Sequence, residues 1–189
     1  MKKKGLIIGI VVAVVILLAF WAIGGYNGLV ESREGVESAR SEISTQLQRR
    51  ADLIPNFVAT VKGYSDYEQE TFIAVTNARS AVTGAGTVAE QAEASEQLDK
   101  AISIWVNAVT EAYPELKASE QYIALQDELS GTENRIAQAR RDYNKSAKEY
   151  NVSVKRFPRS VLASVFGFDS YDYFEADAGT ENVPQVSFE

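Results

Sequence analysis

The chain lacks two residue types that carry much of enzyme chemistry, because neither cysteine nor histidine occurs among its 189 residues. Without cysteine there are no disulfides, thiolate nucleophiles or zinc–sulfur sites. Without histidine there is no Ser-His-Asp triad and no HExxH metal site, and the commonest general base near neutral pH is missing. A carboxylate-bridged metal site in a helical bundle also uses histidine, so we expect no catalytic residue, metal or cofactor.

Basic residues are scarce beyond the first few positions. The chain has 19 basic and 26 acidic residues, and three of the basic ones are Lys2, Lys3 and Lys4. The remaining 16 basic residues face all 26 acidic ones, which gives the rest of the chain a net charge near −10. Nucleic acid and bare anionic lipid repel such a surface, so we expect no nucleic-acid partner.

The N-terminal segment, residues 1–25, has no charge after Lys4, and the next charged residue is Glu31. A hydrocarbon core of about 30 Å is crossed by about 20 helical residues, so this segment predicts a transmembrane helix and a lipid bilayer as partner. The side chains expected to form the membrane anchor are Leu6, Ile7, Ile8, Ile10, Val11, Val12, Val14, Val15, Ile16, Leu17, Leu18, Phe20, Trp21 and Ile23.

A cleaved signal peptide is the alternative interpretation of this segment, with Ala22-Ile23-Gly24 as the cleavage site. The apolar part of a signal peptide normally spans only about 7–15 residues, and this one is longer. Phe20 and Trp21 also stand where interfacial aromatic residues are typical, so we expect an uncleaved anchor. Three lysines precede the span, whereas only Arg33 and Arg40 follow closely. The positive-inside rule then predicts a cytoplasmic N-terminus and a large domain outside the cytoplasm.

Residues 26–168 show helical periodicity and predict an all-α fold, an antiparallel (up-down) four-helix bundle with long helices. The expected helices cover about 28–51, 53–82, 87–112 and, starting at Pro114 or Ser119, up to Val154. Apolar stripes support the first, with Leu29, Val36, Ile43 and Leu47, and the third, with Leu98, Ile102, Trp105 and Val109. The fourth carries an unbroken heptad seam that is typical of coiled-coil-like packing: Leu125, Leu129, Thr132, Ile136, Ala139, Tyr143, Ala147, Tyr150 and Val154.

Proline and glycine mark the expected breaks. Pro55 has two interpretations: it stands in the first turn of a new helix, which we expect, or it kinks one long helix running from Gly28 to Val82. Residues 83–86 form the connection between the second and third helices. Phe157-Pro158 ends the fourth helix, and a short helix at 160–166 follows, with Gly167 as its C-terminal glycine. Residues 169–189 are acidic and lack helical period, which predicts a mostly irregular tail.

Two polar patterns are candidates for recognition. Arg49 and Arg50 stand beside Asp52, so they either clamp an anion or pair with acids and fix how helices join; we expect the second, because no third donor is evident. Tyr-Asn occurs at Tyr26, Tyr143 and Tyr150, and the last two repeats are seven residues apart and therefore share one helix face. Such tyrosines either line a hydrated interface or, as we expect, lie on a core face where their hydroxyls have hydrogen-bond partners.

Several blocks resemble the LemA family over nearly the whole chain. They are Tyr26-Asn27-Gly28-Leu29-Val30, QLQRRADLIPNFVATVKGY (residues 46–64), YPELKAS (113–119), LQDELSGTENRIAQARRDYN (125–144), FPRSVLASVFGF (157–168) and the final Pro184-Gln185-Val186-Ser187-Phe188. The motif residues that we expect to be structural are Arg49, Arg50, Asp52, Leu53, Pro55, Asn56, Tyr64, Arg140, Arg141, Tyr143, Asn144, Phe157 and Pro158. One departure is Tyr67, where the family has histidine.

The resemblance implies a bacterial plasma-membrane protein with one N-terminal span, a helical bundle, no enzyme activity and no cofactor. Similar proteins are associated with envelope functions and membrane shaping. The expected function is a membrane-anchored scaffold of the bacterial cell envelope that binds a second copy of itself or an envelope protein. The alternative is a carboxylate-dependent envelope hydrolase, which needs two carboxylates about 5–9 Å apart, one with a pKa raised by burial.

Overall fold

The computed structural model of the chain describes residues 2–62 and 69–175. Its described residues form five α-helices and a 3₁₀ turn and contain no strand. The helices are α1 (Lys2–Lys62), α2 (Gln69–Gly84), α3 (Val88–Ala112), α4 (Glu120–Lys155) and α5 (Arg159–Phe166), and the turn is η1 (Pro114–Ala118). The all-α fold with one long apolar N-terminal helix is therefore confirmed.

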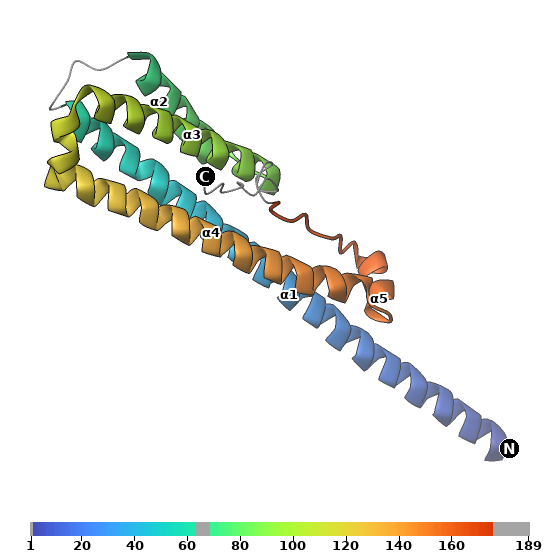
Figure 1. The fold of residues 1–189 in the computed structure, drawn as a ribbon. Coiled ribbons are helices and arrows are strands. Elements are labelled where there is room, and N and C mark those ends of the chain that lie inside the picture. Colours follow the sequence, from blue (N-terminus) through green and yellow to red (C-terminus); the bar gives the residue numbers. More distant parts are fainter. Residues whose placement is uncertain (1, 63–68, 176–189) are drawn as a thin grey trace, which may run out of the picture.

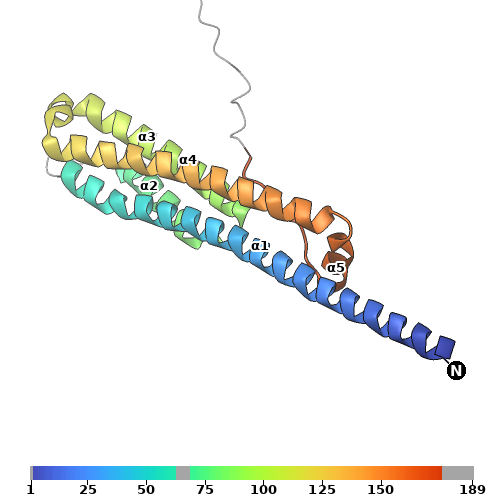
Figure 2. The same ribbon diagram turned by 90° about the horizontal axis from the view of Figure 1, so that it is seen from below.

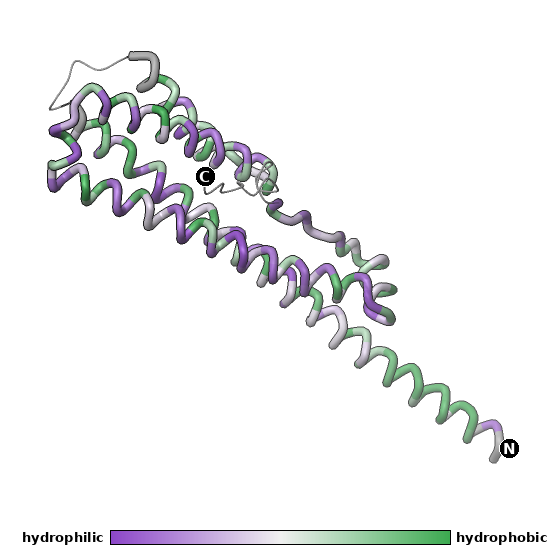
Figure 3. Tube along the Cα trace, in the orientation of Figure 1, coloured by the Kyte–Doolittle hydropathy of each residue, from purple (hydrophilic) through white to green (hydrophobic). Residues whose placement is uncertain are grey.

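The helices are arranged as two pairs. The C-terminal half of α1 lies along α4, and α2 lies along α3 on one side of this pair (Figures 1 and 2). The N-terminal part of α1 projects alone from one end of the bundle, beside α5. This projecting part is the apolar part of the helix (Figure 3). It is long and apolar enough to cross a membrane, and its most apolar stretch is not buried against the bundle.

The predicted apolar stripes form the core. Leu29, Val36 and Ile43 of α1 are fully buried, and so are Tyr143 and Ala147 on the seam of α4. Every seam residue from Leu129 to Val154 is buried, and Leu125 is partly buried against the same core. The α3 stripe is also buried. The heptad pattern thus identified the faces along which α1 and α4 pack.

The expected start of a new helix at Pro55 was wrong, because α1 passes through Pro55 without a break. The alternative of one helix through Pro55 holds as far as Lys62, and α2 is a separate helix. Proline has no N–H, so the carbonyl of Ala51, four residues earlier, loses its helical donor. Arg79 of α2 replaces that donor: its Nε lies 3.0 Å from the carbonyl oxygen of Ala51. In one straight helix these residues would be about 42 Å apart, so the contact also shows that α2 folds back along α1.

The remaining breaks are stabilised locally. Thr87 caps α3 in a capping box with Glu90, whose carboxylate also accepts from the backbone N–H of Gly86 at 2.8 Å. These backbone hydrogen bonds hold the pKa of Glu90 below its usual value. Ser119 caps α4, and Gly167 ends α5 with a φ of 70°, a left-handed conformation that suits glycine. The predicted connection, the break at Phe157-Pro158 and the short helix are confirmed.

Candidate functional site

The segment from Asp169 to Glu175, which we call the strap, follows α5 and runs back along α4 without helical structure. It is the described part of the predicted irregular tail. The strap is held by the side chains of α4 at two points, separated by one heptad of the helix.

Two asparagine amides hold the strap backbone. Asn151 donates from Nδ2 to the carbonyl of Tyr171 at 2.8 Å, and its Oδ1 accepts from the Tyr171 N–H at 2.8 Å. Asn144 forms the same pair with Phe174, at 2.8 Å and 2.9 Å. An asparagine amide has one acceptor and one donor group side by side, so it pairs with a peptide backbone as a neighbouring strand does. These contacts therefore hold the strap backbone against α4.

Aromatic contacts accompany these two pairs of asparagine hydrogen bonds, which we call the clamps. The ring of Tyr150 meets that of Tyr171 edge-on, with centroids 5.2 Å apart, and Tyr143 meets Phe174 in the same way at 5.2 Å. The hydroxyl of Tyr143 donates to the carbonyl of Asp172 at 3.0 Å. The guanidinium of Arg140 covers the Phe174 ring at 5.5 Å from its centroid. Both Tyr-Asn repeats on α4 therefore contact the strap and hold it against the helix.

Tyr171 also joins the strap to α1. Its hydroxyl donates to Oε1 of Glu37 at 2.6 Å. Burial raises the pKa of Tyr171 well above its usual value, and the hydrogen bond to the Glu37 carboxylate raises it further. Burial also raises the pKa values of Tyr143 and Tyr150. The three tyrosines therefore stay neutral over the whole physiological pH range, and Tyr143 and Tyr171 keep the protons that they donate.

The first Tyr-Asn repeat serves a different contact. The Tyr26 ring meets Phe166 at 5.0 Å and Phe168 at 5.6 Å, between centroids, and so lies against the end of α5. Sequence reasoning missed the strap as an occupant of the α4 face. The seven-residue spacing of Asn144 and Asn151 was the available signal, but the strap itself has no period that identifies its register.

A second polar cluster lies at Arg50, in the middle of the bundle. Arg50 is buried on α1, and its Nη1 lies 2.5 Å from Oδ1 of Asp99 on α3. Its Nη2 lies 3.8 Å from Oε2 of Glu133 on α4. Burying a guanidinium costs free energy unless acidic side chains pair with it. The two ion pairs of Arg50 therefore connect α1 with α3 and with α4.

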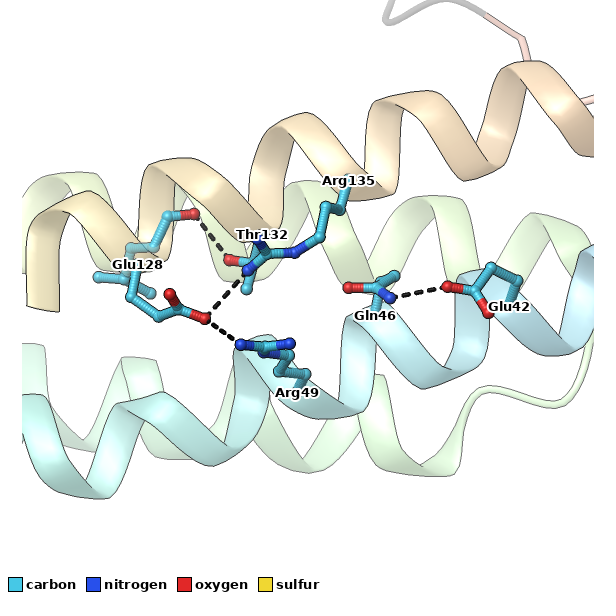
Figure 4. Close-up of polar contacts among 7 residues, drawn as sticks. Glu42, Gln46, Arg49, Glu128, Thr132 and Arg135 are labelled. Carbon is cyan, nitrogen blue, oxygen red and sulfur yellow. Dashed lines mark hydrogen bonds and ion pairs between the residues drawn. The ribbon is translucent and has the colours of Figure 1, made fainter.

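The neighbouring charges also join helices (Figure 4). Arg49 of α1 donates to Oε1 of Glu128 on α4 at 2.6 Å, and Arg135 donates to the same oxygen at 3.0 Å. Asp52 accepts from Gln48 at 2.9 Å and lies 3.6 Å from Arg79 of α2. Arg49 and Arg50 thus pair with different carboxylates and do not converge on one anion.

A groove of about 410 Å³ lies between α3 and α4, next to Arg50. Phe57 and Leu129 contribute apolar lining, whereas Ser103, Asn107 and Gln126 are polar. Asp99 and Glu133 both border this groove, with side chains 41% and 66% exposed, and Arg50 pairs with both. Oδ1 of Asp99 is buried and faces the guanidinium of Arg50.

The other motif residues are dispersed. Leu53 packs partly buried on the core, and the exposed Asn56 accepts a hydrogen bond at its carbonyl from Thr60. Arg141 donates to Gln138 on the surface of α4. Phe157 and Pro158 are exposed at the turn before α5. Tyr64 and Tyr67 lie outside the described residues.

An apolar, uncovered helix that continues into a helical bundle defines the class of this protein: a membrane-associated protein with an all-helical domain. The chain belongs to the LemA family, whose family model matches residues 39–188.

The chain is similar to three curated relatives. It is 28% identical to magnetosome protein MamQ of Magnetospirillum gryphiswaldense, over 85% of this chain and 70% of that protein. It is also 28% identical to magnetosome protein MamQ 2 of Paramagnetospirillum magneticum, over 87% of this chain and 71% of the relative. Protein LemA of Metamycoplasma hominis is 27% identical over 83% of this chain and 72% of its own length.

Proposed function

We propose that this protein is a non-enzymatic, membrane-anchored scaffold of the bacterial cell envelope, which organises the membrane by binding other proteins or copies of itself. The observation that carries the proposal is the continuity of α1. One helix of 61 residues contains both the exposed apolar segment and the residues that pack against α4. A helix without a flexible joint holds the bundle at a defined distance from the bilayer, which suits a scaffold.

The anchor is proposed to remain uncleaved. Ala22 is partly buried against the core, and Gly25 faces Leu162 of α5 so closely that a Cβ would lie 2.6 Å from Leu162 Cδ1. The last turn of the apolar segment is therefore part of the folded unit. The intact mass of the membrane-purified protein is expected to include residues 1–24. A mature chain starting near Gly25 would overturn the anchor.

The bundle is proposed to lie outside the cytoplasm, on the basis of Lys2, Lys3 and Lys4. The chain has no cysteine, so Ser170→Cys in the exposed part of the strap introduces one reporter. It is expected to react with a membrane-impermeant maleimide in cells whose outer wall has been opened. Lys4→Cys, on the other side of the span, is the matched control and is expected to react only after lysis. The reverse pattern would contradict this topology.

The groove between α3 and α4 is the feature that an envelope hydrolase would need. Its two carboxylates are both paired with Arg50. None of the three relatives carries the name of an enzyme. These observations favour a structural role for Asp99 and Glu133. The charge-neutral variants Asp99→Asn and Glu133→Gln should therefore lower the melting temperature of the protein.

A further inference from the structure

Helix α5 and the turn before it carry an apolar surface that the core does not use. Val161 and Val165, one turn apart on α5, are 53% and 71% exposed; Phe157, in the turn before the helix, is 79% exposed, and Phe166, at the end of the helix, is 56% exposed. The opposite face, with Leu162 and Ala163, is buried. Other large exposed apolar residues of the described bundle, such as Ile73, Ile104 and Ile123, lie singly on three different helices. A contiguous exposed apolar patch marks an interaction surface, whereas scattered residues do not.

The position of α5 along α1 points to the lipid bilayer as the partner of this surface. Twenty residues from Leu6 to Gly25 span about 30 Å, so the outer boundary of the hydrocarbon lies near Gly25. Leu162 packs against Gly25, and Phe166 meets the Tyr26 ring. Figures 1 and 2 show α5 beside α1, where α1 projects from the bundle. The short helix thus lies close to the expected outer boundary of the hydrocarbon.

The charges around α5 differ in sign from the rest of the domain. Residues 150–168 contain Lys155, Arg156 and Arg159 and no acidic residue, although the chain beyond the span is near −10. An apolar helix face flanked by basic residues is typical of a helix that lies in the membrane interface, buried by about 5–10 Å. Basic residues close to the bilayer are attracted to anionic headgroups.

We propose that the exposed apolar side chains of α5 and of the turn before it, Phe157, Val161, Val165 and Phe166, lie in the interfacial region of an anionic bilayer as a second membrane contact beside the span. The proposal rests on the anchoring of α1 proposed above. Because α5 packs on α1 at Gly25, this contact would fix the depth of the span and the tilt of the bundle over the membrane.

Three single-cysteine variants of the full chain test the contact: Val165→Cys, Phe20→Cys and Ile104→Cys. Each is labelled with the same environment-sensitive fluorophore and reconstituted in nanodiscs of phosphatidylcholine and phosphatidylglycerol. Lipids brominated near the headgroup end of their chains serve as quencher. Ile104 is the matched control, because it is an apolar side chain that is 62% exposed on α3, away from the span. Phe20 reports the anchor itself.

We expect the probe at position 165 to lose fluorescence to the brominated lipid, and the probe at position 104 to keep it. An unquenched position 165 beside a quenched position 20 would overturn the α5 contact and leave the anchor intact. Shielding of position 165 from both brominated lipid and aqueous iodide would instead indicate a protein partner and would also overturn it. An unquenched position 20 would overturn the anchor and, with it, this proposal.

The apolar face itself is tested in a second background. With the probe at position 161, Phe157→Ser with Val165→Ser is expected to abolish the quenching, and Ile104→Ser is expected to leave it unchanged. Replacement of Lys155 and Arg156 by glutamate is expected to reduce the quenching in anionic nanodiscs. Equal quenching in all these backgrounds would show that the label, rather than the α5 face, enters the lipid.

Discussion

Arg79 and Asn151 each satisfy backbone groups of a segment that is distant in the sequence. Arg79 donates to a carbonyl that Pro55 has left without its helical partner, and Asn151 pairs with both backbone groups of Tyr171. Leaving a buried backbone group without a partner costs about 1–3 kcal/mol. These side chains therefore hold neighbouring segments in place through backbone contacts.

Arg79→Ala is expected to lower the free energy of unfolding by about 1–3 kcal/mol, because the carbonyl of Ala51 loses its donor. In a Pro55→Ala background the restored N–H at position 55 satisfies that carbonyl, so the loss should shrink. Denaturant unfolding in detergent, arranged as a double-mutant cycle, measures the coupling. Arg141→Ala, which removes a surface arginine that contacts Gln138, is the control. Equal losses in both backgrounds would contradict the role assigned to Arg79.

Asn151→Asp is expected to release the strap, because a carboxylate still accepts from the N–H of Tyr171 but repels its carbonyl. Asn144→Asp should act in the same way at Phe174. Hydrogen exchange at the Tyr171 and Phe174 amides is the measurement, and faster exchange is the expected result. Asn134→Asp introduces the same charge at an exposed position of α4 and should leave both amides protected.

At the residue scale, the sequence contained part of the site. Arg50 continues the seven-residue series of Leu29, Val36 and Ile43, so its burial and its need for acidic partners could have been anticipated. The partner of Arg79 could not, because a backbone carbonyl has no sequence signature. The strap contacts were hidden for the same reason, since Asn144 and Asn151 bind backbone rather than particular side chains.

At the scale of elements, the α4 seam is the strongest pattern in the chain, and its burial is confirmed. Ile136→Ala is expected to cost about 2–5 kcal/mol, because Ile136 is 3% exposed in the core. Ile123→Ala, the same substitution on the same helix, should cost under about 1 kcal/mol, because Ile123 is 46% exposed. Chemical denaturation of the two variants gives the difference, and similar costs would mean that the assigned face is wrong.

The strap should give the protein a measurable alkaline sensitivity. Burial and Glu37 raise the pKa of Tyr171 above its usual 10.0, so the folded chain keeps a proton that the unfolded chain loses. The stability from this difference is fully present below pH 10 and is lost as the pH rises toward the folded pKa. Tyr171→Phe should therefore make the melting temperature fall less steeply above pH 10. Tyr173→Phe, at a more exposed strap position, should retain the parental slope.

Helix ends were predictable where they depend on local chemistry, as at Thr87, Ser119 and Gly167. The end of α1 was not, because a proline that ordinarily breaks a helix is tolerated where another segment supplies the missing donor. Residues 53–62 consequently belong to α1, and α2 contains only the later part of the predicted second helix. Periodicity alone does not distinguish a helix that continues from one that restarts in the same register.

At the scale of the whole molecule, α1 is a rod of about 90 Å that is free over its apolar part. Gly5 and Gly9 form a small-xxx-small pair in this part, and a Cβ on Gly9 would meet nothing within 4 Å. Such pairs allow two helices to approach closely in lipid. The charge near −10 on the rest of the chain opposes association, and salt screens this repulsion over about 8 Å at physiological ionic strength.

The full-length protein is therefore expected to assemble in detergent, and Gly5→Leu with Gly9→Leu should make it monomeric. Light scattering at matched salt measures both, and a fragment lacking residues 1–25 should be mostly monomeric. Gly24→Leu, at the other end of the span, is the control that should still assemble. A monomeric parent protein would remove self-assembly and leave an adapter for a different envelope protein.

The distance between Asn144 and Asn151 also sets how far the strap must advance between its two points of attachment. Seven residues of helix between Asn144 and Asn151 rise by about 10.5 Å, and three extended residues from Tyr171 to Phe174 advance by about the same length. The spacing of the two asparagines along α4 therefore matches the spacing of Tyr171 and Phe174 along the strap. A shift of one residue would bring other backbone groups to the two asparagines, and it would also move Tyr171 and Phe174 away from the rings of Tyr150 and Tyr143. The two aromatic contacts therefore select the register in which both asparagines hold the strap.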